Sequence, residues 1–428
     1  FWNNYSERLL STFFQEGIFM IRFPEAIRQI ISTASPAPEE QIACDRSLGR
    51  VLSSKVLSPE ALPPFTNSAM DGFAVSSRQL ESQSGPFRMR VKDIIAAGDA
   101  IRERGETGPN ECWEIMTGAV VPNDCDAVIK VEEITREGDT IQFSRVVRSG
   151  ENIRKSGEDF QIGKEVSDSG TRVYPEHLMS FAALGIHSVS VCRKPTVAVV
   201  STGSELATDA GPGTGKIRNS TAPYLLSELN ALGIDAKFLG VIEDDPNVFL
   251  SLMETELAKN VDVILSTGAV SMGRYDFVAP ALRDLGAEIL FHKVAIRPGK
   301  PLLFAKLGKT AFFGVPGNPV STAVGLRFFV EPYLRSLQGL PSEQAYRAIL
   351  ENDTKKPLGL RCFFKAEVSQ GQTLRTVKIL SGQESFRVAP FLAANCWAIL
   401  PEDGDRAVKG SEIDVYPIHS WSSKEGIL

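Results

Sequence analysis

Residues 292–320 read HKVAIRPGKPLLFAKLGKTAFFGVPGNPV, and this stretch combines closely spaced cations, several turns and a predicted helix start. It opens with a run that predicts a short extended segment. Lys293 and Arg297 would share one face of that segment, because side chains alternate along a strand. A Pro-Gly turn then delivers Lys300. Charge-assisted hydrogen bonds bind oxyanions strongly, so we predict a receptor for an anion, in the simplest case a phosphate-bearing ligand.

The rest of the stretch predicts a hairpin followed by a helix. Two apolar runs, 302–307 and 310–315, are joined by a Gly-Lys pair, which is typical of a tight hairpin turn. The second run stops at a Pro-Gly-Asn-Pro sequence. We expect Asn318 to cap a helix and Pro319 to lie in its first turn. The free N–H groups at such a helix end would add to the anion receptor.

Strands and helices alternate along the chain before this stretch. The expected strands are 196–200, 236–242, 261–265 and 288–291, and the expected helices are 219–232, 246–259 and 275–285. This alternation predicts a doubly wound, mostly parallel α/β sheet with helices on both faces. Such sheets bind ligands outside the carboxyl ends of their strands, near the point where the strand order reverses.

Four turns at those expected strand ends are rich in small and polar residues. They read STGSEL, EDDP, STGAVSMG and VPGNP, beginning at residues 201, 243, 266 and 315. Glycine allows a close approach of backbone to a ligand, and hydroxyl and carboxylate groups suit phosphate or a metal-bridged anion. One such turn would be routine, whereas four on one edge predict a binding site.

Two further segments have plain structural interpretations when taken alone. Asp71 precedes Gly72, and Asp-Gly is a common turn pair, so spacing alone favours an ordinary β-turn. Residues 152–159 carry two cations and two carboxylates, and taken alone this composition favours a solvated charged loop. Short alternating strands between 87 and 147, and again after 339, predict two small β-domains.

Composition narrows the class of protein. The 428 residues are 43% hydrophobic and 23% charged, as in an ordinary globular protein of several domains. The net charge of −6 argues against a general nucleic-acid binder, and no apolar run reaches the ~18 residues of a membrane span. The six cysteines are scattered without metal spacing, which predicts buried thiols and a cytoplasmic protein.

Taken together, eight segments resemble the molybdopterin molybdenumtransferase family, which includes bacterial MoeA and the E domain of gephyrin. They are PPFTNSAMDGFAV, IMTGAVVP, NIRKSGEDF, VVSTGSEL, GKIRNS, STGAVSMGRYDF, KVAIRPGKPLLFA and GVPGNPVS. The similarity runs from about Phe23 to Ile418. Each motif alone is weak, but the ordered set is specific, and it replaces the plain interpretations of Asp71 and of residues 152–159.

The resemblance implies an activity and an assembly. The family inserts molybdenum from molybdate into adenylylated molybdopterin and releases AMP, with a divalent cation such as Mg²⁺ required. It also implies a homodimer whose active site lies between subunits. Transient contacts with the molybdopterin adenylyltransferase and with molybdoenzyme-maturation proteins are expected as well.

The resemblance further implies a domain plan. Residues 1–19 are a candidate extraneous leader, because the chain begins without Met and Met20 opens a plausible natural start. The expected domains are a discontinuous N-terminal helical dimerisation domain (20–64 and 151–192), an inserted β-domain (65–150), an adenylyltransferase-like α/β domain (193–340) and a C-terminal β-barrel-like domain (341–428).

Family positions carry over to named residues. The expected catalytic residues are Asp71, Thr117, Asp159, Glu205, Asp244, Asp276 and Lys293. Glu205, Asp244 and Asp276 are the expected Mg²⁺ ligands. The expected substrate-binding residues are Ser201, Thr202, Gly203, Asn219, Ser220, Ser266, Thr267, Gly268, Ser271, Arg297, Lys300, Pro316, Gly317, Asn318 and Pro319. Asp71, Thr117 and Asp159 would face residues 196–320 of the second subunit.

Three positions depart from the family pattern. Arg297 stands where some members have Lys, Asn219 and Thr221 stand where Asp and Asn are frequent, and Ala269 replaces a frequent Gly. None of them removes an expected carboxylate. Two other functions stay open: a scaffold that uses the gephyrin E-like fold to bind a receptor, and an adenylyltransferase-like nucleotide enzyme. The flanking β-domains count against the second.

Overall fold

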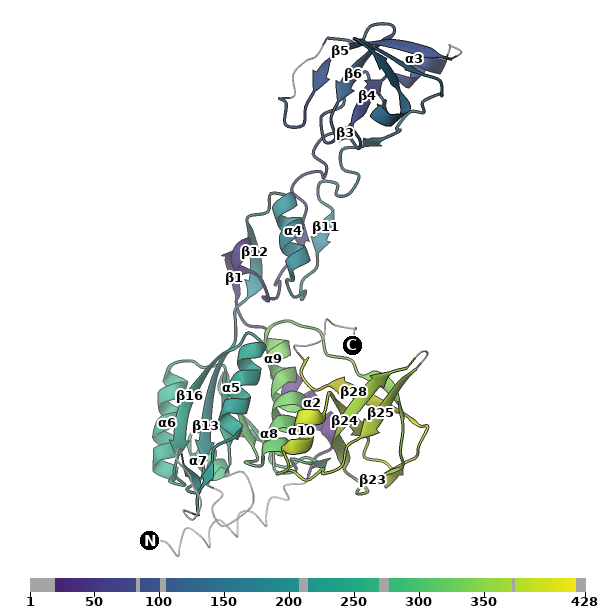
Figure 1. The fold of residues 1–428 in the computed structure, drawn as a ribbon. Coiled ribbons are helices and arrows are strands. Elements are labelled where there is room, and N and C mark those ends of the chain that lie inside the picture. The colour runs from purple at the N-terminus through teal and green to yellow at the C-terminus, as the bar shows by residue number, and fades with distance from the viewer. Residues whose placement is uncertain are drawn as a thin grey trace, which may run out of the picture. The chain divides into compact units, whose positions relative to one another are not determined.

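The structure is a computed structural model that describes residues 20–81, 85–100, 105–207, 215–268, 277–371 and 374–420. It divides into two compact units. Unit 1 contains Phe1–Glu40, Gly49–Ser53 and Val191–Leu428, and unit 2 contains Gln41–Leu48 and Ser54–Ser190. Each unit contains a large sheet of its own and its own core (Figure 1).

The centre of unit 1 is a six-stranded sheet in the order β16-β13-β17-β21-β20-β18. Its strands are β13 (Thr196–Thr202), β16 (Asp235–Ile242), β17 (Val263–Thr267), β18 (Glu288–Phe291), β20 (Leu303–Leu307) and β21 (Thr310–Val315). The first four strands of the order are mutually parallel, and β20 runs antiparallel to both of its neighbours. The predicted doubly wound, mostly parallel sheet is therefore confirmed.

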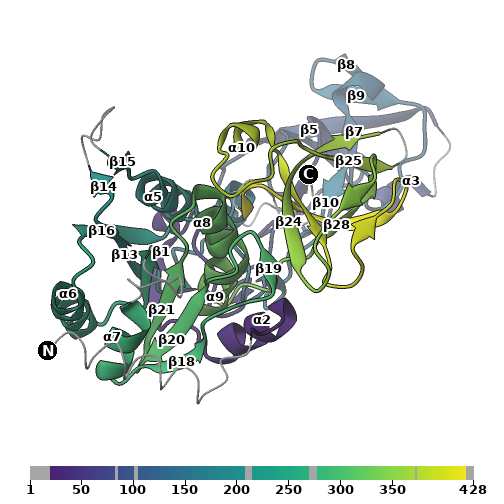
Figure 2. The ribbon, with the colours of Figure 1, turned by 90° about the horizontal axis from the view of Figure 1, so that it is seen from below.

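Helices cover both faces of this sheet, as the view from below in Figure 2 shows. They are α5 (Thr221–Ala231), α6 (Pro246–Ala258), α7 (Val278–Asp284) and α8 (Pro319–Gly325). Alternate residues of β13 explain the two layers. Val197 and Val199 pack in one core with α5 and α8, whereas Ala198 and Val200 pack in a second core with α6 and α7. A strand buried on both faces reads as a continuous apolar run, as this one does.

The hairpin and the helix predicted from residues 302–320 are present. β20 and β21 pair with Leu307 opposite Thr310, which leaves a two-residue turn. α8 begins at Pro319 and continues through the π-helical segment η3 (Leu326–Val330) into α9 (Glu331–Leu337). Asn318 occupies the cap position, but its side chain makes no capping hydrogen bond, so the predicted cap is wrong.

The predicted extended segment around Lys293 is also wrong in part. Only β19 (Ile296–Arg297) is a strand, and the amide of Ile296 donates to the carbonyl of Val294 at 2.8 Å. This contact between residues two apart bends the chain at Ala295. Lys293 and Arg297 therefore do not share the face of one continuous strand.

The C-terminal part of unit 1 is a closed barrel. Its strands are β22 (Tyr346–Leu350), β24 (Arg361–Gln370), β25 (Arg375–Ile379), β26 (Cys396–Leu400) and β28 (Glu412–Pro417). The order β24-β25-β22-β28-β26 closes because β26 also pairs with β24, and β19 joins β24 from outside. Two short strands, β23 (Thr354–Lys355) and β27 (Arg406–Ala407), pair beside it, and α10 (Ala389–Ala393) precedes β26. The barrel-like domain is as predicted.

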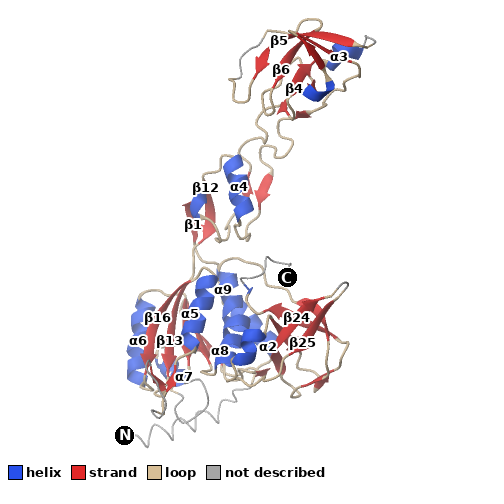
Figure 3. Cartoon of the chain, in the orientation of Figure 1, coloured by secondary structure: helices blue, strands red, loops and turns tan. Residues whose placement is uncertain are grey.

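Unit 2 contains a six-stranded sheet of its own, drawn as red strands in Figure 3. Its order is β7-β4-β6-β5-β9-β8. The strands are β4 (Gly72–Val75), β5 (Phe87–Ile95), β6 (Glu111–Ile115), β7 (Ala127–Lys130), β8 (Thr135–Glu137) and β9 (Thr140–Phe143). Separate cores pack around residues such as Phe73 and Trp113. The β-domain predicted between 87 and 147 is therefore present.

The remaining elements are short. Unit 2 also holds η1 (Cys44–Arg46), α3 (Ser77–Glu81), η2 (Val131–Glu133), α4 (Pro175–Ala183) and the pairs β2 (Val56–Leu57) with β11 (Glu165–Ser167) and β3 (Asn67–Ser68) with β10 (Ile153–Arg154). β1 (Glu39–Ala43) pairs with β12 (Ser188–Cys192), and in unit 1 β14 (Leu206–Ala207) pairs with β15 (Ile217–Arg218). The helix α2 (Phe23–Ser32) packs in the core of unit 1, and the predicted domain boundaries stay predictions.

All six cysteines are free, and Cys44 alone among them is not fully buried. This agrees with the thiols predicted from the sequence. Within the described ranges, we find no helix of the length and apolarity needed to cross a membrane.

Candidate functional site at the carboxyl edge of the α/β sheet

The register of the parallel strands brings the predicted turns to one edge of the sheet. Ser201 of β13 is aligned with Thr267 of β17, and Thr267 is aligned with Val315 of β21. On the other side of β13, Thr202 is aligned with Ile242, the last residue of β16. The four turns therefore follow one another along the edge, over three strand spacings of about 4.8 Å, or ~14 Å. That span suits an extended ligand with several groups.

A closed ring of hydrogen bonds joins side chains at this edge. The Nδ2 of Asn219 donates to the hydroxyl of Ser201 at 2.9 Å, and the hydroxyls of Ser201 and Thr267 lie 3.0 Å apart. The hydroxyl of Thr267 lies 3.3 Å from that of Thr221, which donates to the Oδ1 of Asn219 at 3.1 Å. Each of the four groups can donate one bond and accept one. The ring therefore ties the start of α5 to the ends of β13 and β17.

The start of α5 shows how this ring is built. Ser220 occupies the cap position without a capping side-chain bond, while the Oδ1 of Asn219 accepts the amide of Ala222 at 3.1 Å. Asn219 therefore supplies the cap one residue early. On the opposite face of the sheet, the hydroxyl of Ser266 is buried and has no hydrogen-bond partner among the described residues. Buried polar groups are normally paired, so this hydroxyl is available to a ligand or an ordered water.

Glycine is required where two of the turns meet. Gly268 has φ +89°, and a Cβ there would lie 2.4 Å from the carbonyl oxygen of Thr202. A Cβ on Gly317 would lie 3.9 Å from the Cα of Gly268, so the Pro-Gly-Asn-Pro loop contacts this turn. The hydroxyl of Thr322 closes that loop by donating to the carbonyl of Pro316 at 2.6 Å. Backbone is therefore exposed to a ligand without intervening side chains.

Two predicted carboxylates lie at the turn after β13. The amide of Ser204 donates to the Oδ2 of Asp244 at 3.4 Å, and the carboxylate oxygens of Glu205 come within 2.7 Å of the place a Cβ of Gly203 would take. Glu205 is exposed and Asp244 is half-buried. Oxygen donors of this kind are the ligands that Mg²⁺ takes, and their position beside the turn fits such an ion.

Two predicted site residues cannot be placed. Asp276 and Ser271 lie outside the described residues. Among the residues that are described, no group of three or more His, Cys, Asp or Glu is arranged to hold a metal ion. All three proposed ligands of the Mg²⁺ site therefore stay predictions from the sequence.

The predicted cations lie on one loop, and a hydrogen bond joins the two ends of this loop. The amide of Val294 donates to the carbonyl of Lys300 at 3.1 Å, which brings the two ends of the loop together. Lys293 is half-buried, and Arg297 and Lys300 are exposed. None of the three forms an ion pair with a described acidic residue. Three cations on one loop, with no acidic partner among the described residues, are available to an anion.

The same loop reaches the start of α8. A Cβ on Gly299 would lie 3.6 Å from the carbonyl oxygen of Ser321, in the first turn of that helix. The cation loop and the Pro-Gly-Asn-Pro loop therefore lie next to each other. The structure therefore brings together the two halves of residues 292–320.

In unit 2, two of the three predicted residues are in contact. The Oδ1 of Asp71 accepts hydrogen bonds from the amide of Thr117 at 2.7 Å and from its hydroxyl at 2.8 Å. These bonds, the amide first, hold the pKa of Asp71 below its usual value. Asp71 is exposed and stays ionised. Asp159 forms no described bond with this pair, and its own amide donates to the carbonyl of Leu62 at 3.0 Å.

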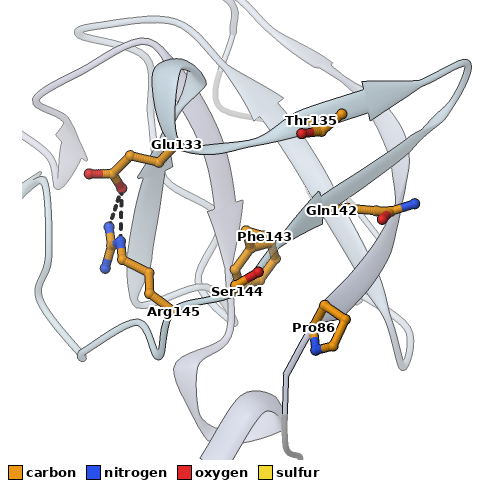
Figure 4. A pocket seen from close by; sticks show the side chains of 7 residues that line it. All are labelled: Pro86, Glu133, Thr135, Gln142, Phe143, Ser144 and Arg145. Atoms are coloured by element: carbon orange, nitrogen blue, oxygen red, sulfur yellow. Dashed lines mark hydrogen bonds and ion pairs between the residues drawn. The ribbon is translucent and has the colours of Figure 1, made fainter.

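A separate pocket lies in the β-domain of unit 2. Figure 4 shows its lining, which consists of Pro86, Glu133, Thr135, Gln142, Phe143, Ser144 and Arg145. The Nε of Arg145 donates to the Oε2 of Glu133 at 2.9 Å on its wall. None of these residues was predicted as a site residue, and the two charged residues of the lining, Glu133 and Arg145, form an ion pair with each other. We do not assign this pocket to the site.

Sequence reasoning missed one contribution from the C-terminal barrel. The carbonyl of Ser385, in the loop after β25, accepts the amide of Val320 in the first turn of α8 at 3.0 Å. This bond takes the place of the predicted Asn318 cap. The loop reads SGQES, so its Gly- and Ser-rich composition matched that of the four predicted turns and was the signal available.

Three known protein-family regions match successive parts of the chain. Residues 21–185 match the MoeA N-terminal region (domains I and II), residues 198–336 match the probable molybdopterin binding domain, and residues 347–418 match the MoeA C-terminal region (domain IV). Molybdopterin molybdenumtransferase of Synechococcus elongatus is 34% identical over 405 residues, covering 92% of this chain and 99% of that protein. The chain belongs to the molybdopterin molybdenumtransferase family.

Further relatives agree. Molybdopterin molybdenumtransferase of Bacillus subtilis is 34% identical over 94% of this chain and 95% of its own length. The crystal structure of a molybdopterin biosynthesis MoeA protein from Pyrococcus horikoshii superposes with a TM-score of 0.79 at 28% identity, covering 94% of this chain and all of that chain (100%). Membership in this family makes the chain an enzyme, a transferase of molybdenum cofactor biosynthesis.

Proposed function

We propose that this transferase inserts molybdenum from molybdate into adenylylated molybdopterin and releases AMP, with Mg²⁺ required. The observation that carries the proposal is the carboxyl edge of the sheet. There, Lys293, Arg297 and Lys300 lie on one loop without described acidic partners, and that loop touches the start of α8. Cations held by a turn suit an oxyanion or a phosphate. The acids Glu205 and Asp244 lie at the other end of the same edge.

The residues of the edge have distinct roles in this proposal. Lys293, Arg297 and Lys300 bind molybdate and the phosphates through charge-assisted hydrogen bonds. Gly268 and Gly317 let the backbone approach the substrate, and the ring around Asn219 fixes the strand ends on which the substrate rests. The turns thereby hold the ligand in one orientation.

Glu205, Asp244 and Asp276 would hold Mg²⁺. The ion supplies charge neutralisation at the phosphate group when bound. The two described carboxylates flank the Gly203–Ser204 turn and offer oxygen donors at the edge, which is what such an ion needs.

We also propose a homodimer in which Asp71, Thr117 and Asp159 of one chain face the sheet edge of the other. The Asp71–Thr117 contact supports a role for this turn, because it fixes an ionised carboxylate on the surface. The free cysteines support the expected cytoplasmic location. Transient contacts with the adenylyltransferase and with maturation proteins would deliver substrate and receive product.

The test of the activity is incubation with adenylylated molybdopterin, Mg²⁺ and molybdate, following AMP and the metal-loaded cofactor together. The proposal expects both products in equal amounts, and expects neither when molybdate is omitted. The Asp276→Ala variant should keep its fold and lose AMP release. AMP release that does not depend on molybdate would contradict the proposal and favour a nucleotide-cleaving enzyme.

Mixing two inactive variants tests the shared site. If the site combines Asp71 of one chain with Lys293 of the other, a mixed dimer of Asp71→Asn and Lys293→Ala contains one intact site. Random exchange at equal amounts then restores about a quarter of the wild-type activity, since half of the dimers are mixed and each has one working site of two. If both residues came from one chain, mixing would restore no activity.

A further inference from the structure

A fully buried lysine lies on the outside of the C-terminal barrel. Lys365 belongs to β24 and is 0% exposed. Its neighbours on the same face, Phe363 and Trp397, belong to the core that the barrel shares with the α/β sheet, whereas Ala366 faces the barrel interior. Lysine is almost never fully buried unless its charge is satisfied. The position of Lys365 therefore needs an explanation.

Backbone carbonyls satisfy the charge of Lys365. Its Nζ donates to the carbonyls of Gly382 at 2.7 Å, Arg387 at 3.0 Å and Glu384 at 3.4 Å. An ammonium group has three N–H bonds, so the three acceptors match its full capacity. Burial lowers the pKa of Lys365, but only the charged form can fill all three acceptors. The ammonium thereby fixes the loop that contains these carbonyls.

A glutamine fixes the same loop from within. The Nε2 of Gln383 donates to the carbonyls of Lys365 and Leu380, each at 2.8 Å. Its Oε1 accepts the amide of Lys365 at 3.0 Å. Residues 380–387, which we name the barrel loop, are therefore attached to β24 by two side chains. A loop held in this way has little freedom to change shape.

The barrel loop contacts the α/β domain at one informative place. Its Ser385 carbonyl accepts the amide of Val320, one residue after the Pro-Gly-Asn-Pro loop of the carboxyl edge. The first amides of a helix have no partner within the helix, and the Asn318 side chain does not supply one here. The barrel loop thus caps the helix whose start borders the predicted anion site.

We propose that Lys365 is a positioning residue for the anion site of this enzyme, acting through the barrel loop on the first turn of α8. This inference rests on the proposed function only in taking that site to bind molybdate. Lys365 touches no substrate. It fixes the loop, the loop fixes the amide of Val320, and that amide fixes the helix start beside the cation loop.

The experiment compares Lys365→Met with a matched control. Lys365→Met keeps an unbranched side chain as far as the ε position and removes the ammonium group with all three donors. Leu350→Ala truncates a fully buried side chain of β22, a strand that does not pair with β24, and this side chain packs in the core inside the barrel. Both variants should destabilise the barrel. A difference between them in the readouts below therefore reports the position of the helix start and not the stability of the barrel.

Two readouts are measured on the full-length protein. Hydrogen exchange at the amide of Val320 should become roughly tenfold faster in Lys365→Met, as expected for the loss of a helix cap, and should be unchanged in Leu350→Ala. Molybdate binding, followed by calorimetry, should weaken in Lys365→Met and not in Leu350→Ala. Equal behaviour of the two variants in both readouts would overturn the proposal.

A milder variant keeps the test possible if Lys365→Met does not fold. Gln383→Ala removes the second attachment and should change both readouts in the same direction by a smaller factor. No change at Val320 in this variant, together with an unfolded Lys365→Met, would also overturn the proposal. If wild-type protein binds no molybdate, the proposed function fails, while the exchange at Val320 still decides whether Lys365 positions the helix.

Discussion

Gly268→Ala should damage the site far more than its small size suggests. The residue has φ +89°, which costs a residue with a Cβ about 1–2 kcal/mol. In addition, the new methyl group would lie 2.4 Å from the backbone carbonyl oxygen of Thr202, whereas real Cβ contacts essentially never fall below 3.0 Å. The turn must therefore move by at least several tenths of an ångström. The backbone of β13 cannot rotate away as a flexible side chain could.

The size of the effect follows from this displacement. A misplacement of about 1 Å can cost about a hundredfold in rate, so a shift of this order predicts a loss of roughly ten- to a hundredfold in kcat/KM, or about 1.4–2.7 kcal/mol. The matched control is Gly308→Ala, in the turn between β20 and β21. Gly308 also has positive φ (+58°), but nothing lies within 4 Å of its missing Cβ.

The assay is molybdate-dependent AMP release with thermal melting of both variants. The two substitutions share the cost of positive φ, so both should melt somewhat below wild type. Only Gly268→Ala should also lose activity. Equal activity of the two variants would refute the reasoning that the turn at Gly268 contacts the substrate.

Three further variants test other parts of the site. Lys293→Ala should weaken molybdate binding, with a difference from wild type that narrows as salt rises, since ions screen the deleted attraction; equal affinities at low salt would contradict the assignment. Thr117→Val removes one of two bonds that lower the pKa of Asp71. That pKa should then rise part of the way to its ordinary value of about 3.9, so Asp71 loses its charge at a higher pH on acidification, as NMR titration can show. Asn219→Ala removes three hydrogen bonds and leaves Ser201 buried with fewer partners, for a loss of about 2–4 kcal/mol. An unchanged melting temperature would show that the ring adds nothing to stability.

Local patterns predicted much of the fold because local chemistry determined it. The apolar run at 196–200 predicted a buried strand, and it forms the first five residues of β13. The Gly-Lys pair between two apolar runs predicted the hairpin of β20 and β21 with its turn. In both cases the decisive contacts lie within a few residues or follow from side-chain periodicity.

The failures involve contacts between distant parts of the chain. The Asn318 cap failed because the carbonyl of Ser385 lies in its place, and that carbonyl belongs to a loop more than sixty residues later in the sequence. The segment at Lys293 pairs with a distant residue, because the amide of Ala295 donates to the carbonyl of Ile21 at 2.8 Å. Local propensity contains no information about such partners.

The candidate site, like the fold, could be predicted only where local sequence patterns determine it. The turns that contain Ser201 and Thr267 could be assigned to one edge, because parallel strands end together. The closed ring through Asn219 and Thr221 could not be predicted, since it depends on where α5 begins relative to two strands. Asp71 and Thr117 were selected by resemblance alone, and their direct hydrogen bonds are a finding of the structure.

The central claim is that the carboxyl edge of the sheet binds molybdate beside the cation loop. Anomalous diffraction at the molybdenum absorption edge, from crystals soaked with molybdate, tests it most directly. The account predicts a peak within hydrogen-bonding reach of Lys293, Arg297 or Lys300, next to the start of α8. A well-occupied peak elsewhere, with none at this loop, would contradict it.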